Sequence, residues 1–386
     1  MTVVLQIAPE IGPGSGVAAV AYQLEQQFQA RGITTARFTL AEARGDWLPD
    51  PGPGIGGKVA TLAQVMWFST VGTALARRAL RRSPDVVAIC HNDALAGDVY
   101  VNHGIVLAAM RARGHALLRM GRNPLHLFTW ARDTVRFTGR AHRVVVNLTQ
   151  AEDRLLRQTY GRIQASTAVI GNGVDTVRLR PPTTWERDAA REAFGFTPDD
   201  VVLLFVGHEF DRKGLPALID AMRGAPSSVR LLVVGGTRDL VDAAGRRCQA
   251  AGIVDRVHFA GPLEDPEPAY RAADLFGLPS AYESFGLVVL EALAYGLPVL
   301  ATPVGVVPDV VQDGANGYIV TDTSEVRDAL GRFAAADHAT LASAARASAV
   351  EFDWGEVAER YVDLLESLGA RFVSGTAPVD ADARAT

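Results

Sequence analysis

Short runs of Val, Leu and Ile alternate with longer amphipathic stretches along most of the chain. The runs occupy residues 3–7, 34–40, 85–90 and 143–148 in the first half, and 201–207, 229–236, 257–261, 275–279 and 298–302 in the second. Helical patterns over 17–31, 58–82 and 150–160 lie between the first four. Continuous aliphatic runs between helices are typical of parallel sheets covered on both faces. The pattern predicts an α/β protein with two Rossmann-like, doubly wound domains.

A stretch rich in Gly, Asn and Pro, GNGVDTVRLRPP (171–182), separates the two halves. Such residues punctuate a chain between regular elements, so the domain junction is expected there. We expect a first domain over residues 1–172 and a second over 173–350. The end of the chain, FVSGTAPVDADARAT, lacks apolar periodicity, which predicts a disordered tail over 371–386.

The net charge of −5 hides an asymmetry between the two halves. Residues 1–172 carry 19 Lys/Arg against 11 Asp/Glu, and the remaining residues carry 19 against 32. Halves of opposite sign indicate domains with different partners. The stretch 111–143 alone holds eight Arg and one acid, Asp133.

The cysteines and the N-terminal residues indicate in which cellular compartment the protein is expected. Cys90 and Cys248 lie far apart and follow apolar or helical sequence, so buried free thiols in a reducing cytoplasm are expected rather than a disulfide or a metal site. The opening MTVVLQIAPE has no basic region, and no run of 18 apolar residues is apparent. We therefore expect neither a signal peptide nor a membrane span.

Two carboxylates flank an apolar segment in AYESFGLVVLEALAY (281–295), Glu283 before it and Glu291 within it. A buried carboxylate is costly unless something pairs with it. Ser284 is a good N-cap, which predicts a helix that carries Glu291 about two turns inside. Glu291 would then accept hydrogen bonds from paired ligand hydroxyls such as those of a ribose. The alternative is a Glu291 paired with a nearby Arg inside the fold.

The start of the same predicted helix is a candidate anion site. The free amides of Phe285, Gly286 and Leu287 would point out of the helix, and Gly286 would let a ligand approach closely. Glu283 would lie beside this site.

A second candidate is the segment VGHEFDRKGLPAL (206–218). A strand ends at Gly207, and the following loop carries Arg212 and Lys213 before a helix. Cations at the carboxyl end of a parallel strand lie where open α/β sheets bind ligands. They could neutralise a diphosphate without a metal. A solvated charged turn is the alternative.

The first domain offers weaker signals. Gly12, Gly14 and Gly16 follow the first strand and permit close approach to a phosphate or a sugar. Their G-x-G-x-G spacing is a poor dinucleotide fingerprint, and the next strand has no acid at its tip to hold a nicotinamide ribose. His91 and His103 each follow an apolar run, and such histidines are usually structural. One of them could reach the cleft and contribute to a site, and we choose His103, which Gly104 follows, as that candidate.

Together these segments resemble the retaining, nucleotide-sugar-dependent glycosyltransferases of family 4, which have the GT-B fold. The resemblance covers most of the chain and is strongest from about 140 to 365. It rests on four segments, AADLFGLPSAYESFGLVVLEALAYGLPVLATPVGVVPDVVQDGANGYIV (272–320), VIGNGVDTVRLRPP (169–182), GHEFDRKG (207–214) and FDWGEVAERYVDLLESL (352–368). The sequence departs from the family at GVVPD and at GPGSG, where a Gly-Gly pair is usual. Within the family, the first domain looks most like the lipopolysaccharide-core glucosyltransferase branch.

The resemblance implies roles for the matching positions. Arg212 and Lys213 would hold the donor diphosphate, and Glu291 would bind the ribose. Glu283 and the amides of 285–287 would contact sugar and phosphate, and His103 would lie near the transferred sugar. The remaining implied donor contacts are Gly14 and Gly16 in the first-domain loop, Gly207 before the cations, and the backbone near Leu263 at the base.

The expected function is transfer of a hexose from a nucleotide diphosphate sugar, UDP-sugar favoured and GDP-sugar possible, with retention of configuration and no metal or other cofactor. The first domain would bind a saccharide, lipid-linked or small-molecule acceptor, no nucleic acid would bind, and residues 351–370 would form a helix that crosses back onto the first domain. The alternatives are a GT-B sugar phosphorylase or nucleotide-sugar epimerase, a Rossmann oxidoreductase, and a non-catalytic sugar-nucleotide sensor.

The basic first domain also suggests a membrane contact. The segment GKVATLAQVMWFSTVGTALARRALRR (57–82) combines an apolar helical run with four arginines at its end. This pattern could lie on an anionic bilayer, at the inner face of the membrane. The alternative is an ordinary packed helix with a solvated basic end.

Overall fold

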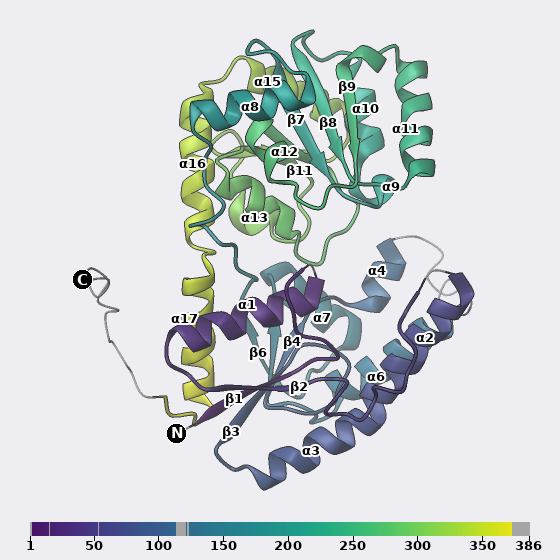
Figure 1. The fold of residues 1–386 in the computed structure, drawn as a ribbon, viewed down its shortest axis with the longest axis vertical. Coiled ribbons are helices and arrows are strands. Elements are labelled where there is room, and N and C mark those ends of the chain that lie inside the picture. The colour runs from purple at the N-terminus through teal and green to yellow at the C-terminus, as the bar shows by residue number, and fades with distance from the viewer. Residues whose placement is uncertain (1, 15, 53, 113–120, 122, 373–386) are drawn as a thin grey trace, which may run out of the picture.

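The computed structural model describes residues 2–14, 16–52, 54–112, 121 and 123–372. It contains two α/β domains joined by the predicted Gly/Pro-rich segment (Figure 1). Most of the predicted tail, residues 373–386, lies outside the described residues. So do residues 113–120 and 122 of the Arg-rich stretch.

The elements of the first domain alternate between strand and helix. They are β1 (Val3–Ile7), α1 (Gly16–Ala30), β2 (Thr35–Phe38), α2 (Gly54–Trp67), the π-helical turn η1 (Phe68–Gly72), α3 (Thr73–Arg82), β3 (Val86–Cys90), β4 (Val99–Asn102), α4 (Val106–Ala112), α6 (Pro124–Thr138), β5 (Val144–Asn147), α7 (Gln150–Tyr160) and β6 (Ser166–Val169). The six strands form a parallel sheet in the order β2-β1-β3-β4-β5-β6.

The second domain repeats this arrangement. Its elements are α8 (Thr184–Phe194), β7 (Val201–Val206), α9 (Phe210–Lys213), α10 (Leu215–Met222), β8 (Val229–Val234), α11 (Arg238–Ala251), the 3-10 turn η2 (Val254–Arg256), β9 (Val257–Gly261), α12 (Glu267–Ala272), β10 (Leu275–Leu278), α13 (Leu287–Ala294), β11 (Val299–Ala301), α14 (Val307–Val310), β12 (Gly317–Ile319), α15 (Thr323–Ala334) and α16 (His338–Val350). Its parallel sheet has the order β12-β11-β10-β7-β8-β9.

Both faces of the first sheet are covered, as the continuous apolar runs predict. Alternate strand residues such as Val87 and Ile89 pack with Leu24 and Phe28 of α1. The residues between them, such as Ala88, pack on the other face in a cluster that includes Phe68, Ala76, Phe137 and Leu156. Helix α1 thus covers one face, while η1, α3, α6 and α7 cover the other.

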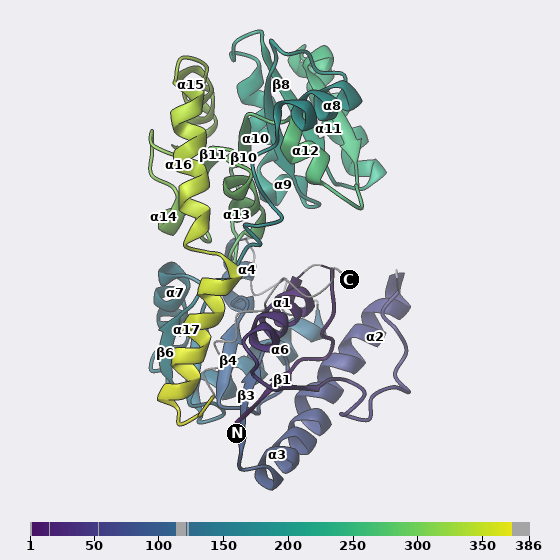
Figure 2. The same ribbon diagram turned by 60° about the vertical axis from the view of Figure 1, so that its left-hand side comes forward.

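The last helix, α17 (Trp354–Ser367), returns to the first domain and packs against α1 (Figures 1 and 2). Arg31 of α1 donates a 2.7 Å hydrogen bond to the Gly355 carbonyl, and the Trp354 amide donates to the Val174 carbonyl at 3.2 Å. Through these contacts the C-terminal helix packs on the first domain. Trp354 and Val174 also line one of the cavities between the domains.

Cys90 and Cys248 are buried free thiols, as predicted. The continuous helix from Gly54 to Arg82 is long and apolar enough to cross a membrane by length and composition alone, contrary to the expectation from the sequence. In the structure its residues Phe68, Thr73 and Ala76 are instead buried against the first domain.

Candidate active site

Three cavities follow one another along the cleft between the domains. The central one, of about 200 Å³, is lined from the first domain by Gly16 and His103 and from the second by Lys213, Glu283 and residues 285–287. It shares Val17, His103 and Ser284 with a cavity of about 410 Å³ that lies mostly in the first domain. It shares Val20 and Leu287 with a cavity of about 130 Å³ that contains Gly14 and Glu291.

The fold therefore brings most of the predicted site residues to one cleft. Arg212 joins them through its contact with Glu283, and Gly207 lies behind Lys213. Leu263 follows β9 and is partly exposed, and it lines none of these three cavities.

Glu283 is the centre of a charged cluster. Its Oε1 accepts hydrogen bonds from Lys213 Nζ at 3.0 Å, from Arg212 Nη1 at 3.2 Å and from the Ser280 hydroxyl at 3.0 Å. Arg212 also donates to Glu209 at 2.7 Å. The carboxylate thus holds both cations in place, at the end of the short helix α9 rather than in the predicted loop.

Gly207 determines where the Lys213 side chain runs. A Cβ added at Gly207 would lie 2.3 Å from Lys213 Cδ. Only a residue without a side chain leaves room for the lysine stem to pass this strand end and reach Glu283.

The helix after Glu283 begins later than predicted. Helix α13 begins at Leu287 and its N-cap is Gly286, with φ of 91° and no side-chain cap. The prediction that Ser284 is the N-cap is therefore wrong: Phe285 is buried in the core, and the chain turns into the helix through the left-handed Gly286. Residues 285–287 still line the central cavity at the start of α13.

Glu291 is consequently the fifth residue of α13, little more than one turn from its start. Its carboxylate accepts a 2.8 Å hydrogen bond from the Tyr270 hydroxyl. Its partner inside the fold is thus a neutral phenol, and no Arg among the described residues forms an ion pair with it, contrary to the alternative. The predicted ribose contact stays a prediction. Burial raises the Glu291 pKa, and the Tyr270 hydrogen bond opposes that shift. The carboxylate still lines the 130 Å³ cavity.

His103 lies where the central cavity meets the first-domain cavity. Its ring stacks on His91 with centroids 5.8 Å apart, and His91 Nε2 lies 2.7 Å from Gln6 Oε1. Burial lowers the pKa of His103 to about 4, so the ring is neutral at physiological pH. Its Nε2 is buried and has no hydrogen-bond partner among the described residues. A ligand in the cavity could satisfy this atom.

The first-domain cavity contains a buried charged cluster that sequence reasoning missed. Arg132 pairs with Asp93 and with Asp133, and Arg136 pairs with Asp133 at 2.8 Å. Asp93, Arg132 and Asp133 line the cavity together with Thr129 and the apolar side chains of Val65, Ile105, Val106 and Leu125. The signal in the sequence was a helix whose only charges, at 132, 133 and 136, interrupt an apolar pattern.

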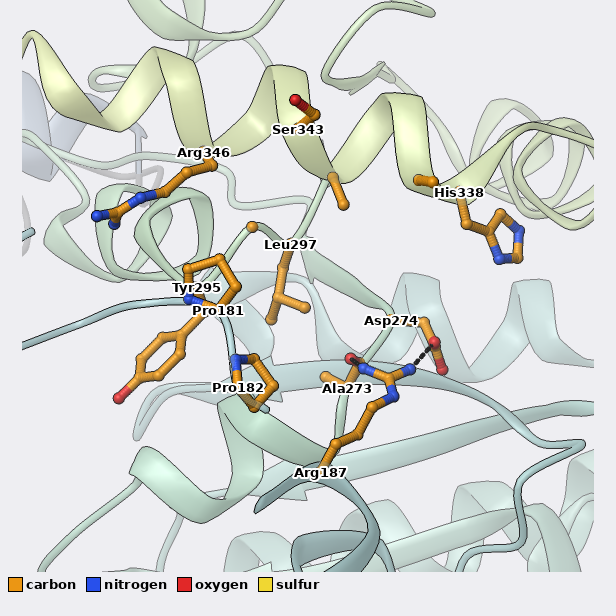
Figure 3. Close-up of a pocket in the computed structure, with 13 residues that line it drawn as sticks. Pro181, Pro182, Arg187, Ala273, Asp274, Tyr295, Leu297, His338, Ser343 and Arg346 are labelled. Atoms are coloured by element: carbon orange, nitrogen blue, oxygen red, sulfur yellow. Dashed lines mark hydrogen bonds and ion pairs between the residues drawn. The ribbon is translucent and has the colours of Figure 1, made fainter. Parts of the chain in front are cut away.

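A larger cavity, of about 550 Å³, lies in the second domain between α16 and the segment that leads into α8 (Figure 3). Its charged groups serve the fold: Arg187 pairs with Asp274, and Arg346 donates to the carbonyls of Leu179 and Ala294. It contains none of the predicted site residues, so its size alone does not make it the site.

Comparisons with known proteins relate the chain to glycosyltransferases. Residues 186–335 match the sequence model of the family Glycosyl transferases group 1. A D-inositol 3-phosphate glycosyltransferase from Xylanimonas cellulosilytica is 38% identical over 231 residues, which are 56% of this chain and 54% of that protein. The matched region thus spans about half the length of this relative.

Solved structures extend the similarity over both domains. WaaG, a glycosyltransferase involved in lipopolysaccharide biosynthesis, superimposes with a TM-score of 0.72 at 21% identity, over 94% of this chain and 99% of WaaG. HepE from Anabaena, in complex with UDP-glucose, gives a TM-score of 0.68 at 20% identity, over 95% and 100% of the two chains. The chain therefore has the GT-B fold of glycosyltransferases. Its residues 186–335 are similar in sequence to the group 1 glycosyl transferases.

Proposed function

We propose that the protein is a retaining hexosyltransferase. It takes a hexose from a nucleotide diphosphate sugar, UDP-sugar foremost and GDP-sugar as the alternative, and transfers it to a hydroxyl of an acceptor in the first-domain cavity. The observation that carries this proposal is the shared wall of the cavities. His103 and Ser284 border both the central and the first-domain cavity, so groups bound in the two would meet there.

The second domain supplies the donor contacts. The ribose would bind at Glu291 beside Gly14, and the diphosphate would lie between Lys213, Arg212 and the first amides of α13. The similarity to HepE, whose structure holds UDP-glucose, supports a UDP-sugar donor. Cations and helix amides that lie ready at the leaving group stabilise the charge that develops as the glycosidic bond breaks.

Glu283 acts in this proposal as a binding and positioning group. One of its oxygens already accepts three hydrogen bonds, two of them from cations. Such a carboxylate is a weaker nucleophile, because its negative charge is compensated by Lys213 and Arg212. Attack by the acceptor hydroxyl on the face that the diphosphate leaves, with the diphosphate taking the proton, therefore fits better than a covalent glycosyl intermediate.

The first-domain cavity would hold the acceptor. Thr129 and the Asp93 carboxylate offer hydrogen bonds to hydroxyls, and Val65, Ile105 and Leu125 offer apolar contact. Arg132 is already neutralised by two carboxylates, so the described part of the cavity suits a hydroxyl-bearing acceptor with an apolar portion. The two buried thiols suit a reducing cytoplasm as the place of reaction.

The test is a reaction of the full chain with a panel of UDP- and GDP-hexoses and a mixture of saccharide, polyol and glycolipid acceptors. We expect acceptor-dependent release of UDP, a product with the donor's anomeric configuration by proton NMR, and full activity in excess chelator. Cleavage that requires inorganic phosphate would indicate a phosphorylase instead. Conversion of the donor to an epimer without transfer would indicate an epimerase.

A further inference from the structure

Helix α6 is inverted in polarity. Its charged residues Arg132, Asp133 and Arg136 are all buried, whereas the side facing solvent is apolar. Leu127 is 43% exposed, Trp130 40% and Val135 58%, and no exposed position between Pro124 and Thr138 is charged. A helix on the surface of a soluble protein normally shows the opposite arrangement. The apolar side of α6 therefore indicates contact with something other than water.

Helix α2 contacts α6 (Figure 1) and also exposes apolar side chains. Ile55 is 82% exposed and Val59 60%, and Met66 is exposed further along the helix. The single charge in α2 is the exposed Lys58. We call the exposed apolar residues of these two helices the apolar face: Ile55, Val59, Met66, Leu127, Trp130 and Val135.

Exposed cations follow along α3. Helices α2 and α3 form one continuous helix with η1, and its last turns expose Arg77, Arg78, Arg81 and Arg82. At 29 residues this helix is about 43 Å long. It thus presents apolar side chains along one part and a cluster of positive charge at its end, the composition of helices that lie on anionic membranes.

We infer that the apolar face docks the first domain onto an anionic lipid bilayer. The charge of the arginine cluster and the excess of basic residues in 1–172 are complementary to anionic headgroups. A symmetric dimer formed through this face would not supply this complementarity, because both copies would present the same cations. The apolar side chains would enter the boundary between headgroups and acyl chains, with α2 and α6 in the plane of the membrane.

The same two helices line the first-domain cavity. Val65 of α2 and Leu125 and Thr129 of α6 border it. A docked molecule would therefore bring this cavity close to the bilayer, where an acceptor with an acyl or polyprenyl portion could enter it. This consequence rests on the proposed transferase function: the acceptor class would be lipid-linked. The docking itself does not depend on that function.

Vesicle flotation of the full chain tests the docking. The probes are phosphatidylcholine vesicles with and without phosphatidylglycerol, at low and high salt. We expect the protein to float with the anionic vesicles at low salt, and the bound fraction to fall as salt rises. The double variant Leu127→Ser, Trp130→Ser should reduce the bound fraction about tenfold, and Arg78→Gln, Arg82→Gln should remove only the salt-sensitive part.

The chain offers a matched control for the apolar substitutions. Val177 and Trp185 are 86% and 77% exposed on the second-domain side of the junction, so Val177→Ser, Trp185→Ser removes similar exposed apolar area elsewhere and should float like the unchanged protein. Near-ultraviolet circular dichroism and a UDP-sugar titration on each variant check the fold and the donor site.

Three outcomes would overturn the docking. The first is that the unsubstituted protein stays unbound to anionic vesicles at low salt. The second is that the Leu127→Ser, Trp130→Ser variant floats normally. The third is that light scattering shows a dimer, which this variant converts to a monomer without loss of vesicle binding. Flotation without any donor binding would instead leave the docking in place and refute the proposed function.

Discussion

The Tyr270 hydroxyl donates a 2.8 Å hydrogen bond to the Glu291 carboxylate. Tyr270 is itself fixed between two rings, parallel to Tyr295 at 5.1 Å and stacked on Phe276 at 6.1 Å. A rigid phenol thus orients a carboxylate in the cleft. Glu291 of the largely apolar helix α13 therefore has one hydrogen-bond partner inside the fold and still borders a cavity that a ligand could enter.

Replacing Glu291 by Gln should weaken donor binding more than it weakens the fold. The amide can still accept from Tyr270, but it loses the charge that strengthens hydrogen bonds to ribose hydroxyls, which is worth about 1.5–3 kcal/mol. We expect the dissociation constant of the UDP-sugar to rise at least about tenfold in calorimetry. Tyr270→Phe should give a smaller rise in the same direction. An unchanged constant in Glu291→Gln would refute the ribose assignment.

Lys213→Met should lower kcat by about 10²- to 10³-fold, because a cation that neutralises the leaving diphosphate acts mainly in the transition state. Donor affinity should fall less, since Arg212 and the α13 amides remain. Steady-state rates of UDP release and a parallel donor titration separate the two effects. Equal losses in both would indicate that Lys213 only binds the donor.

Gly207→Ala tests the position of Lys213 without changing its charge. The added methyl would meet the lysine stem, so kcat should fall in the direction seen for Lys213→Met while the chain stays folded. Gly245→Ala in helix α11 is the matched control, because a Cβ there meets nothing within 4 Å. Its expected kcat is unchanged. A Gly207→Ala protein with normal kcat would show that the position of the Lys213 side chain does not depend on the absence of a Cβ at residue 207.

Thr129→Val should affect the acceptor alone. The substitution preserves shape and removes one hydroxyl from the first-domain cavity, a loss of about 1 kcal/mol that corresponds to a roughly fivefold higher acceptor KM. Donor affinity should not change. Thr134→Val serves as control, since Thr134 lies on the same helix but outside the cavity. If both variants behaved alike, the cavity would not be the acceptor site.

His142 should make stability depend on pH. It is buried with Nδ1 3.1 Å from the Gly97 carbonyl, and burial lowers its pKa to about 3. The unfolded chain protonates this histidine below about pH 6.5 and the folded chain does not, so stability is lost as pH falls from 6.5 towards 3. Between about pH 7 and 4.5 this group should account for about 2.5 kcal/mol of lost stability.

The substitution His142→Gln, which cannot titrate, isolates that contribution. Urea unfolding at the two pH values should show a smaller pH-dependent loss in the variant than in the unchanged protein. Equal losses would mean that His142 is protonated in the folded state.

The sequence predicted the two sheets because buried parallel strands are read as uninterrupted aliphatic runs. It missed β6 and β12, which have only four and three residues, and it recognised β4 (Val99–Asn102) only as the apolar run before His103. Strand β6 also begins with two polar residues, Ser166 and Thr167. The start of α13 was misplaced because Ser284 is a favourable N-cap by type, while burial of Phe285 decides where the helix begins.

Most residues of the proposed donor site could be placed from the sequence because they cluster in two short segments at strand ends, 206–214 and 283–291. The charged cluster of the first-domain cavity could not, since Asp93 and Arg132 are separated by 39 residues and meet only in the folded domain. The Tyr270 partner of Glu291 was hidden for the same reason.

Titration of UDP-glucose and of a GDP-hexose into the full chain and into Glu291→Gln, followed by calorimetry, tests the central claim most directly. The claim is that the cleft holds a nucleotide diphosphate sugar through the second domain. We predict saturable binding of at least one of these donors, weakened about tenfold or more by the substitution. Absence of binding by both nucleotide sugars, or equal binding in the two proteins, would contradict the account.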